Sequence, residues 1–66
     1  MTNAYQAIAI KAEQAGQAYY LDHPCADRAT VDLVARNKFA SVLEQQAFVG
    51  GWAFQFWSEH VTFANN

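Results

Sequence analysis

Apolar residues recur at helical spacing along the first third of the chain and predict a helix over residues 4–21. This segment is rich in Ala, Gln, Glu and Lys, which favour the helical conformation. Its apolar stripe consists of Tyr5, Ile8, Ala12, Ala15 and Tyr19. The middle of the stripe is lined by the small residues Ala12, Ala15 and Gly16, so we expect another helix to approach closely there.

Pro24 predicts the end of this helix, because proline disfavours helical geometry at the residue before it. The turn is expected over residues 22–28. Asp27 is suited to cap the next helix, since its side-chain oxygens accept hydrogen bonds from free backbone N–H groups. Pro24 is suited to the first turn of that helix, and Cys25 is expected to fill space beside it.

The second half of the chain carries a longer apolar stripe with heptad spacing, which predicts one helix over residues 29–62. Its two interleaved lines are Leu33, Ala40, Ala47, Phe54 and Val61, and Arg36, Leu43, Gly50 and Trp57. The stripe keeps its phase through Gly50 and Gly51, which places Gly50 on the packing face as a point of close contact. Two alternatives stay open, since paired glycines also favour a kinked pair of helices broken there or a β-hairpin.

These patterns predict an all-α fold with a single domain over residues 1–66. The expected shape is a helical hairpin, in which the shorter first helix folds back antiparallel on the longer second one. The segment from Ala47 to Trp57 is apolar nearly all round, and one partner helix covers only one face of it. Aromatic rings on the other face would favour a dimer or higher oligomer. The expected interface residues are Phe48, Gly50, Trp52, Phe54, Phe56 and Trp57.

The composition also favours assembly. A chain of 66 residues with one cysteine forms no intrachain disulfide, and cores this small rarely stabilise a fold alone. A hydrophobic content of 53% excludes an intrinsically disordered chain. The formal net charge of −2 argues against generic nucleic-acid binding. The longest apolar run, Ala47–Phe54, is too short to span a membrane, and we expect a cytoplasmic protein.

Side chains capable of chemistry are sparse. The densest group, Asp22–Asp27, holds one histidine and one cysteine at no recognised metal-ligand spacing. Glu59 and His60 are adjacent, whereas di-metal helical bundles use the Glu-x-x-His spacing. We therefore expect no enzyme activity, no catalytic residue, no metal and no cofactor.

Tyrosines and basic residues could instead bind a phosphorylated small ligand, because aromatic rings stack on bases and guanidinium groups pair with phosphate. The candidates are Tyr5, Tyr19, Arg28, Arg36 and Lys38. Arg36 lies on the apolar stripe, so it should extend its charge to solvent or pair with a carboxylate. Asp32, one turn earlier, is the expected partner.

The leading functional hypothesis is a small non-enzymatic protein that binds and blocks another protein. Small, acidic, aromatic-rich chains of this kind resemble accessory proteins of phages and mobile elements, a broad class that includes inhibitors of host defence. That resemblance implies an anti-defence inhibitor. Two alternatives are an oligomer that sequesters a phosphorylated small ligand such as a signal nucleotide, and a structural subunit of a larger complex.

Overall fold

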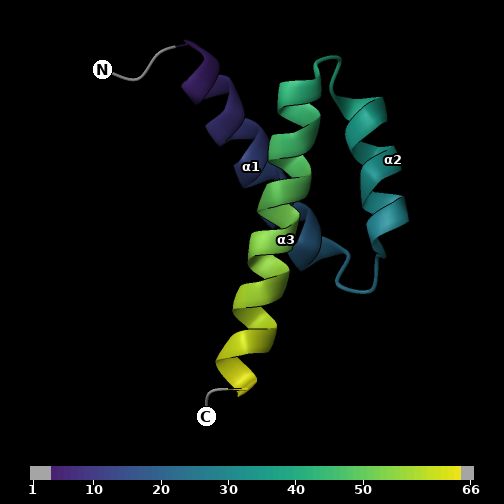
Figure 1. The fold of residues 1–66 in the computed structure, drawn as a ribbon. Helices are drawn as coiled ribbons and strands as arrows, with labels where there is room; N and C mark the ends of the chain where they lie inside the picture. Colours follow the sequence, from purple (N-terminus) through teal and green to yellow (C-terminus); the bar gives the residue numbers. More distant parts are fainter. Residues whose placement is uncertain (1–3, 65–66) are drawn as a thin grey trace.

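Three helices make up the part of the chain that the structure, a computed structural model, describes (Figure 1). The backbone is described over residues 4–64 and the side chains over residues 4–60. Helix α1 spans Ala4–Asp22, α2 spans Arg28–Lys38 and α3 spans Val42–Ala64, and these residues contain no strand. The all-α prediction is confirmed, and α1 agrees with the predicted first helix to within one residue.

The predicted single helix over residues 29–62 was wrong, because the chain turns at Phe39, Ala40 and Ser41. Phe39 is extended, with φ −125° and ψ 139°, and so ends α2. The Ser41 hydroxyl oxygen accepts a hydrogen bond from the backbone N–H of Glu44 at 3.2 Å, and the same hydroxyl donates to the Glu44 carboxylate at 2.8 Å. This Ser-x-x-Glu pattern is a helix-start signal, and it outweighs the continuity of the heptad stripe.

Further hydrogen bonds hold this corner together. The side-chain amide of Gln45 donates to the Phe39 carbonyl oxygen at 2.9 Å, and the Phe39 N–H donates to the Ala35 carbonyl oxygen at 3.0 Å. By contrast, α3 runs without interruption through Gly50 and Gly51. The two alternatives that placed a break or a β-turn at these glycines are therefore excluded.

The turn between α1 and α2 is close to its predicted position. Asp27 caps α2 as expected, since its side-chain oxygen accepts a hydrogen bond from the Thr30 backbone N–H at 2.8 Å. Pro24 lies in the turn rather than in the helix. Cys25 is exposed and free, so it does not fill space in the core. Both of these expectations are corrected, because the helix begins only at Arg28.

Helix α3 is the central element, and both other helices pack on it. In Figure 1, α1 crosses α3 while α2 lies alongside it, and the backbones of α1 and α2 do not approach each other within the described residues. Gly16 of α1 meets α3 near Phe48, and Tyr20 meets it near Phe56. Contacts therefore advance in the same direction along both helices, and α1 and α3 are parallel. The expected antiparallel packing was wrong, because α2 runs in the opposite direction to α1 and the chain reverses a second time before α3 begins.

Two glycines allow the backbones of α1 and α3 to touch. A Cβ atom on Gly16 would lie 2.9 Å from the Phe48 carbonyl carbon and 2.9 Å from the Trp52 nitrogen. A Cβ atom on Gly51 would lie 2.7 Å from the Glu13 carbonyl carbon. Real Cβ atoms do not come so close to backbone, so both positions require glycine. The prediction of a close helix approach at the small residues of α1 is confirmed.

The core is an aromatic cluster around Phe48, which is 0% exposed. Its ring centroid lies 5.7 Å from that of Tyr19 on α1 and 5.6 Å from that of Phe39 at the end of α2. One α3 side chain thus contacts residues from both neighbouring segments. The buried members of the cluster are Tyr20, Val31, Ala35, Phe48 and Trp52.

Candidate functional site

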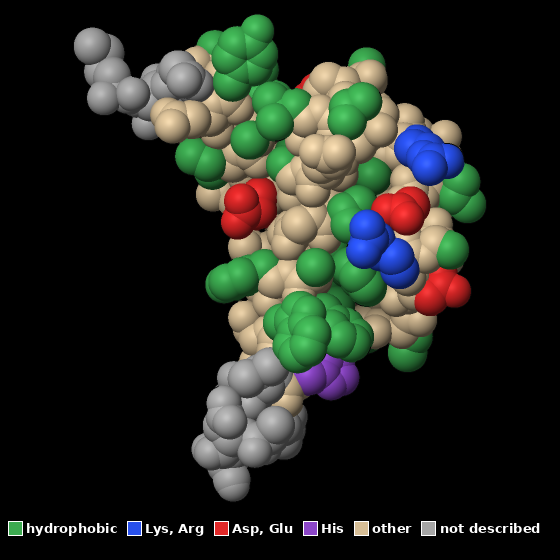
Figure 2. All heavy atoms as spheres, viewed as in Figure 1, with side chains coloured by type: hydrophobic (Ala, Val, Ile, Leu, Met, Phe, Trp, Pro, Cys, Tyr) green, Lys and Arg blue, Asp and Glu red, His purple; other side chains and the backbone are tan. Residues whose placement is uncertain are grey.

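The outward side of α3 carries an uncovered apolar row, which we call the outer seam. It consists of Leu43, Ala47, Gly50, Phe54 and Trp57. The spacing alternates between four and three residues, as in the seam of a coiled coil. Phe54 is 60% exposed and Trp57 is 64% exposed, and a Cβ atom on Gly50 would have nothing within 4 Å. Figure 2 shows hydrophobic side chains gathered over the lower half of α3.

The outer seam is the α3 part of the stripe that the sequence analysis placed on the packing face. That placement was wrong, because α1 packs on the side of α3 that carries Phe48, Gly51 and Trp52. Gly51, and not Gly50, is the glycine in close contact. The side chain of Val61, the last predicted member of the stripe, lies outside the described residues.

Of the six predicted interface residues, two belong to the core of the chain itself. Phe48 is fully buried and Trp52 is 9% exposed, so neither offers a surface to a partner. Phe56 is partly covered, with its ring centroid 5.7 Å from that of Trp52 and 4.2 Å from that of His60. Gly50, Phe54 and Trp57 remain open to solvent.

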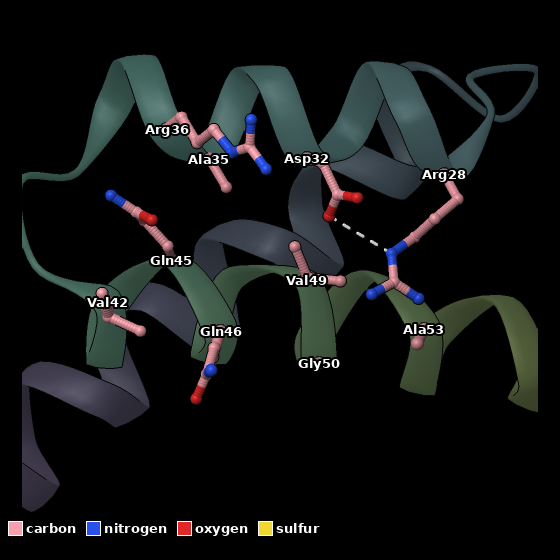
Figure 3. Close-up of a pocket in the computed structure, with 10 residues that line it drawn as sticks. All are labelled: Arg28, Asp32, Ala35, Arg36, Val42, Gln45, Gln46, Val49, Gly50 and Ala53. Carbon is pink, nitrogen blue, oxygen red and sulfur yellow. Dashed lines mark hydrogen bonds and ion pairs between the residues drawn. The ribbon is translucent and has the colours of Figure 1, made fainter.

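A groove of about 540 Å³ lies between α2 and α3 (Figure 3). Arg28, Asp32 and Arg36 border it from α2, while apolar side chains, including those of Val49 and Ala53, border it from α3. The Arg28 Nε atom lies 3.2 Å from an Asp32 carboxylate oxygen and donates a hydrogen bond to it. The expected pairing of Asp32 with Arg36 was therefore wrong.

Arg36 itself is exposed at this groove. In Figure 3 its guanidinium group extends from α2 toward the groove, next to the Ala35 side chain. No carboxylate forms an ion pair with Arg36 among the residues that the structure describes. The alternative expectation for this residue, a charge extended to solvent, is confirmed.

The five predicted ligand-binding residues do not meet at one place. Tyr5 is exposed near the start of α1. Tyr19 packs its ring against those of His23 and Phe48. Lys38 borders a second groove of about 400 Å³, which Lys11 also lines. Of the five, Arg28 and Arg36 both line the groove between α2 and α3.

Apart from Gly50, the residues on the α3 side of the first groove, which include Gln46 and Val49, were not predicted as part of a site. No simple pattern marks these residues, because the groove exists only once α2 has folded back on α3. The turn at Phe39–Ser41 creates it, and the Ser-x-x-Glu signal at Ser41 is the feature that could have revealed it.

Residues 4–60 bring together no group of three or more His, Cys, Asp or Glu side chains that could hold a metal. None of the helices in that part is long and apolar enough to cross a lipid bilayer.

The pKa of Asp27 is held below its ordinary value by the hydrogen bonds from Thr30. The hydrogen bond from the Thr30 backbone N–H makes the largest contribution to this lowering, and that from the Thr30 side chain comes second.

Comparison with protein-family models, with curated proteins and with solved structures finds no match to this chain.

Proposed function

We propose that this chain is a non-enzymatic binding protein that works as a self-associated assembly, with a second copy covering the outer seam. The observation that carries the proposal is the solvent exposure of a heptad row with two aromatic rings. Exposed apolar surfaces of this kind mark interaction sites. A coiled-coil seam pairs with another seam of the same spacing, and a second copy supplies one.

The sizes of the seam residues favour an antiparallel pair. Large rings, Phe54 and Trp57, occupy one end, and the small residues Ala47 and Gly50 occupy the middle. A twofold axis at Gly50 would set Phe54 of each copy against Ala47 of the other, and Trp57 against Leu43. Each ring would then meet a smaller residue, which is the self-complementary arrangement that a twofold interface requires. Gly50 would allow the two α3 backbones to approach.

The charges near the seam do not oppose this pairing. Glu44 is the one carboxylate adjacent to the described part of the seam in the heptad, and its side chain accepts a hydrogen bond from Ser41. Gln46 and Ala53, which also flank the seam, are uncharged. Two copies would therefore bring few like charges together, although each chain has a formal net charge of −2.

The exposed area indicates an interface of modest size. A buried aromatic side chain covers about 150–250 Å², so Phe54 and Trp57 leave roughly 250 Å² uncovered per chain. With Leu43 and neighbouring atoms, two copies would bury on the order of 900 Å², which is below the ~1,200–2,000 Å² of stable specific interfaces and typical of weak, transient ones. We therefore expect an association that depends on protein concentration.

Sedimentation velocity over a wide range of protein concentration tests the proposal. The wild-type chain should convert from monomer to dimer as concentration rises, and Trp57→Ser should remain monomeric. Leu21→Ser is the matched control, because Leu21 on α1 is similarly exposed, at 61%, but lies off the seam. A wild-type chain that stays monomeric up to several hundred micromolar, or a Leu21→Ser chain as impaired as Trp57→Ser, would contradict it.

The inhibition of a host defence protein remains a prediction from the general character of the sequence. Its support is indirect: a chain with no reactive cluster in its described part and with exposed aromatic rings is suited to binding. Stoichiometric co-purification of one host protein, together with loss of its activity on addition of the chain, is the test. The absence of any such protein would favour a role in the assembly alone.

A further inference from the structure

We propose that the groove between α2 and α3 binds a small organic anion, with one phosphate or carboxylate head and a compact apolar body. The residues that line this groove all belong to one chain. The groove therefore forms without a second copy, although Gly50 borders both the groove and the outer seam. The proposal goes beyond the proposed function because it assigns a ligand class to a different surface.

Arg36 is the group that would hold the anionic head. Its guanidinium is exposed at the groove and has no ion-pair partner among the described residues. Asp32, the nearest carboxylate on α2, is occupied by Arg28. A guanidinium presents planar N–H donors that match a phosphate or carboxylate with two parallel hydrogen bonds. Arg36 is thus a charged donor available to a ligand.

The separation of the two arginines limits the shape of the ligand. Arg28 and Arg36 are eight residues apart, which is about 12 Å along a helix axis. The charge of Arg28 is already offset by Asp32, which leaves Arg36 to bind the head. The ligand should therefore place its head at Arg36 and extend its body along the groove toward Ala53.

The floor of the groove suits such a body. Ala35, Val49 and Ala53 present apolar groups along its length, and the Gln46 side chain is exposed at its edge. Gln45 contributes less, because its amide already donates to the Phe39 carbonyl oxygen. The volume of about 540 Å³ falls within the usual range for small-molecule sites. A nucleobase or a short aliphatic chain would fit this description.

The full chain titrated with adenosine monophosphate and, separately, with octyl phosphate tests the proposal, with binding followed by NMR shifts of the groove residues. Saturable binding of either compound would support it, and the compound that binds more tightly identifies a planar or an aliphatic body. Adenosine and inorganic phosphate are the comparison ligands, because each lacks one part of the proposed ligand. Both should bind at least about tenfold more weakly.

Arg36→Gln should weaken binding about tenfold or more, because a charge-assisted hydrogen bond is lost. Lys38→Gln is the matched control: it removes the same charge from the same helix, but Lys38 borders the other groove. It should change the affinity less than twofold. No binding of either compound at millimolar concentration, or equal losses in the two variants, would overturn the proposal. Inorganic phosphate binding as tightly as either compound would also overturn it.

Discussion

Gly16 of α1 and Gly51 of α3 each face the backbone of the opposite helix at the crossing of the two helices. A Cβ atom on either would lie within 3 Å of carbonyl carbons across the interface, whereas Gly50, the next residue along α3, has open space. Two neighbouring glycines in one helix thus have opposite surroundings. The parallel packing of α1 on α3 depends on Gly16 and Gly51, the two glycines at the crossing.

Replacement of Gly16 or Gly51 by alanine should therefore destabilise the fold. Backbone atoms cannot move aside as a flexible side chain can, so we expect a loss of about 2 kcal/mol or more in the free energy of unfolding. Gly50→Ala is the internal control at protein concentrations that keep the chain monomeric, and there it should stabilise α3 by about 0.5–1 kcal/mol, as alanine does within a helix. Urea denaturation of the three variants gives these values. Equal effects at Gly50 and Gly51 would contradict the crossing.

Trp52 combines a large buried ring with an unsatisfied polar group. The indole is 9% exposed, and its Nε1 atom is buried with no hydrogen-bond partner among the residues that the structure describes. Trp52→Ala should cost about 3–5 kcal/mol in stability. Trp52→Phe should cost far less, because it removes a buried donor whose desolvation costs about 1–3 kcal/mol. Calorimetric unfolding compares the two, and a Phe variant as unstable as the Ala variant would show that Nε1 has a partner.

Ser41 is predicted to keep α2 and α3 separate. Ser41→Ala removes the hydroxyl that accepts from the Glu44 N–H, and loss of such a cap costs about 0.5–2 kcal/mol. Ser41→Asp should retain most of the stability, because aspartate also caps helices. Chemical denaturation measures both changes. If Ser41→Ala were as stable as the wild type, the cap would not be needed to start α3.

Acid should weaken the cap of α2. The hydrogen bonds from Thr30 lower the pKa of Asp27 below its ordinary value of 3.8, so its stabilising contribution is present above that value. The contribution disappears as the pH falls through the lower pKa of the folded chain. Asp27→Asn, which caps without ionising, should lose less thermal stability between about pH 6 and pH 3. Identical losses in the two chains would rule out the contribution of Asp27.

Helical periodicity predicted the all-α fold and the position of α1 because these depend on local propensity and spacing. The same periodicity misplaced the outer seam. The row through Leu43, Gly50 and Trp57 has a regular heptad spacing, but the row through Phe48 and Trp52 is the buried one. Rotation of α3 about its axis depends on which residues α1 and α2 contact, and spacing alone does not specify those contacts.

The groove was predictable only in part. Arg28 and Arg36 were recognised as candidates for binding an anion, and both line it. Its other wall comes from α3, which lies opposite α2 only because the chain reverses at Ser41. A long single helix would have left Arg36 without that wall. The short capping signal at Ser41 therefore determines both the topology and the candidate site.

Disulfide trapping tests the central claim, that a second copy covers the outer seam with a twofold axis at Gly50. In a Cys25→Ser background, which removes the free cysteine, Gly50→Cys should form a crosslinked dimer quickly under mild oxidation, because a disulfide requires Cα atoms within about 7 Å. Phe54→Cys should crosslink slowly, since an antiparallel pair separates the two copies of residue 54 by about 12 Å along the axis. Fast crosslinking at residue 54 with none at residue 50, or none at either, would contradict the account.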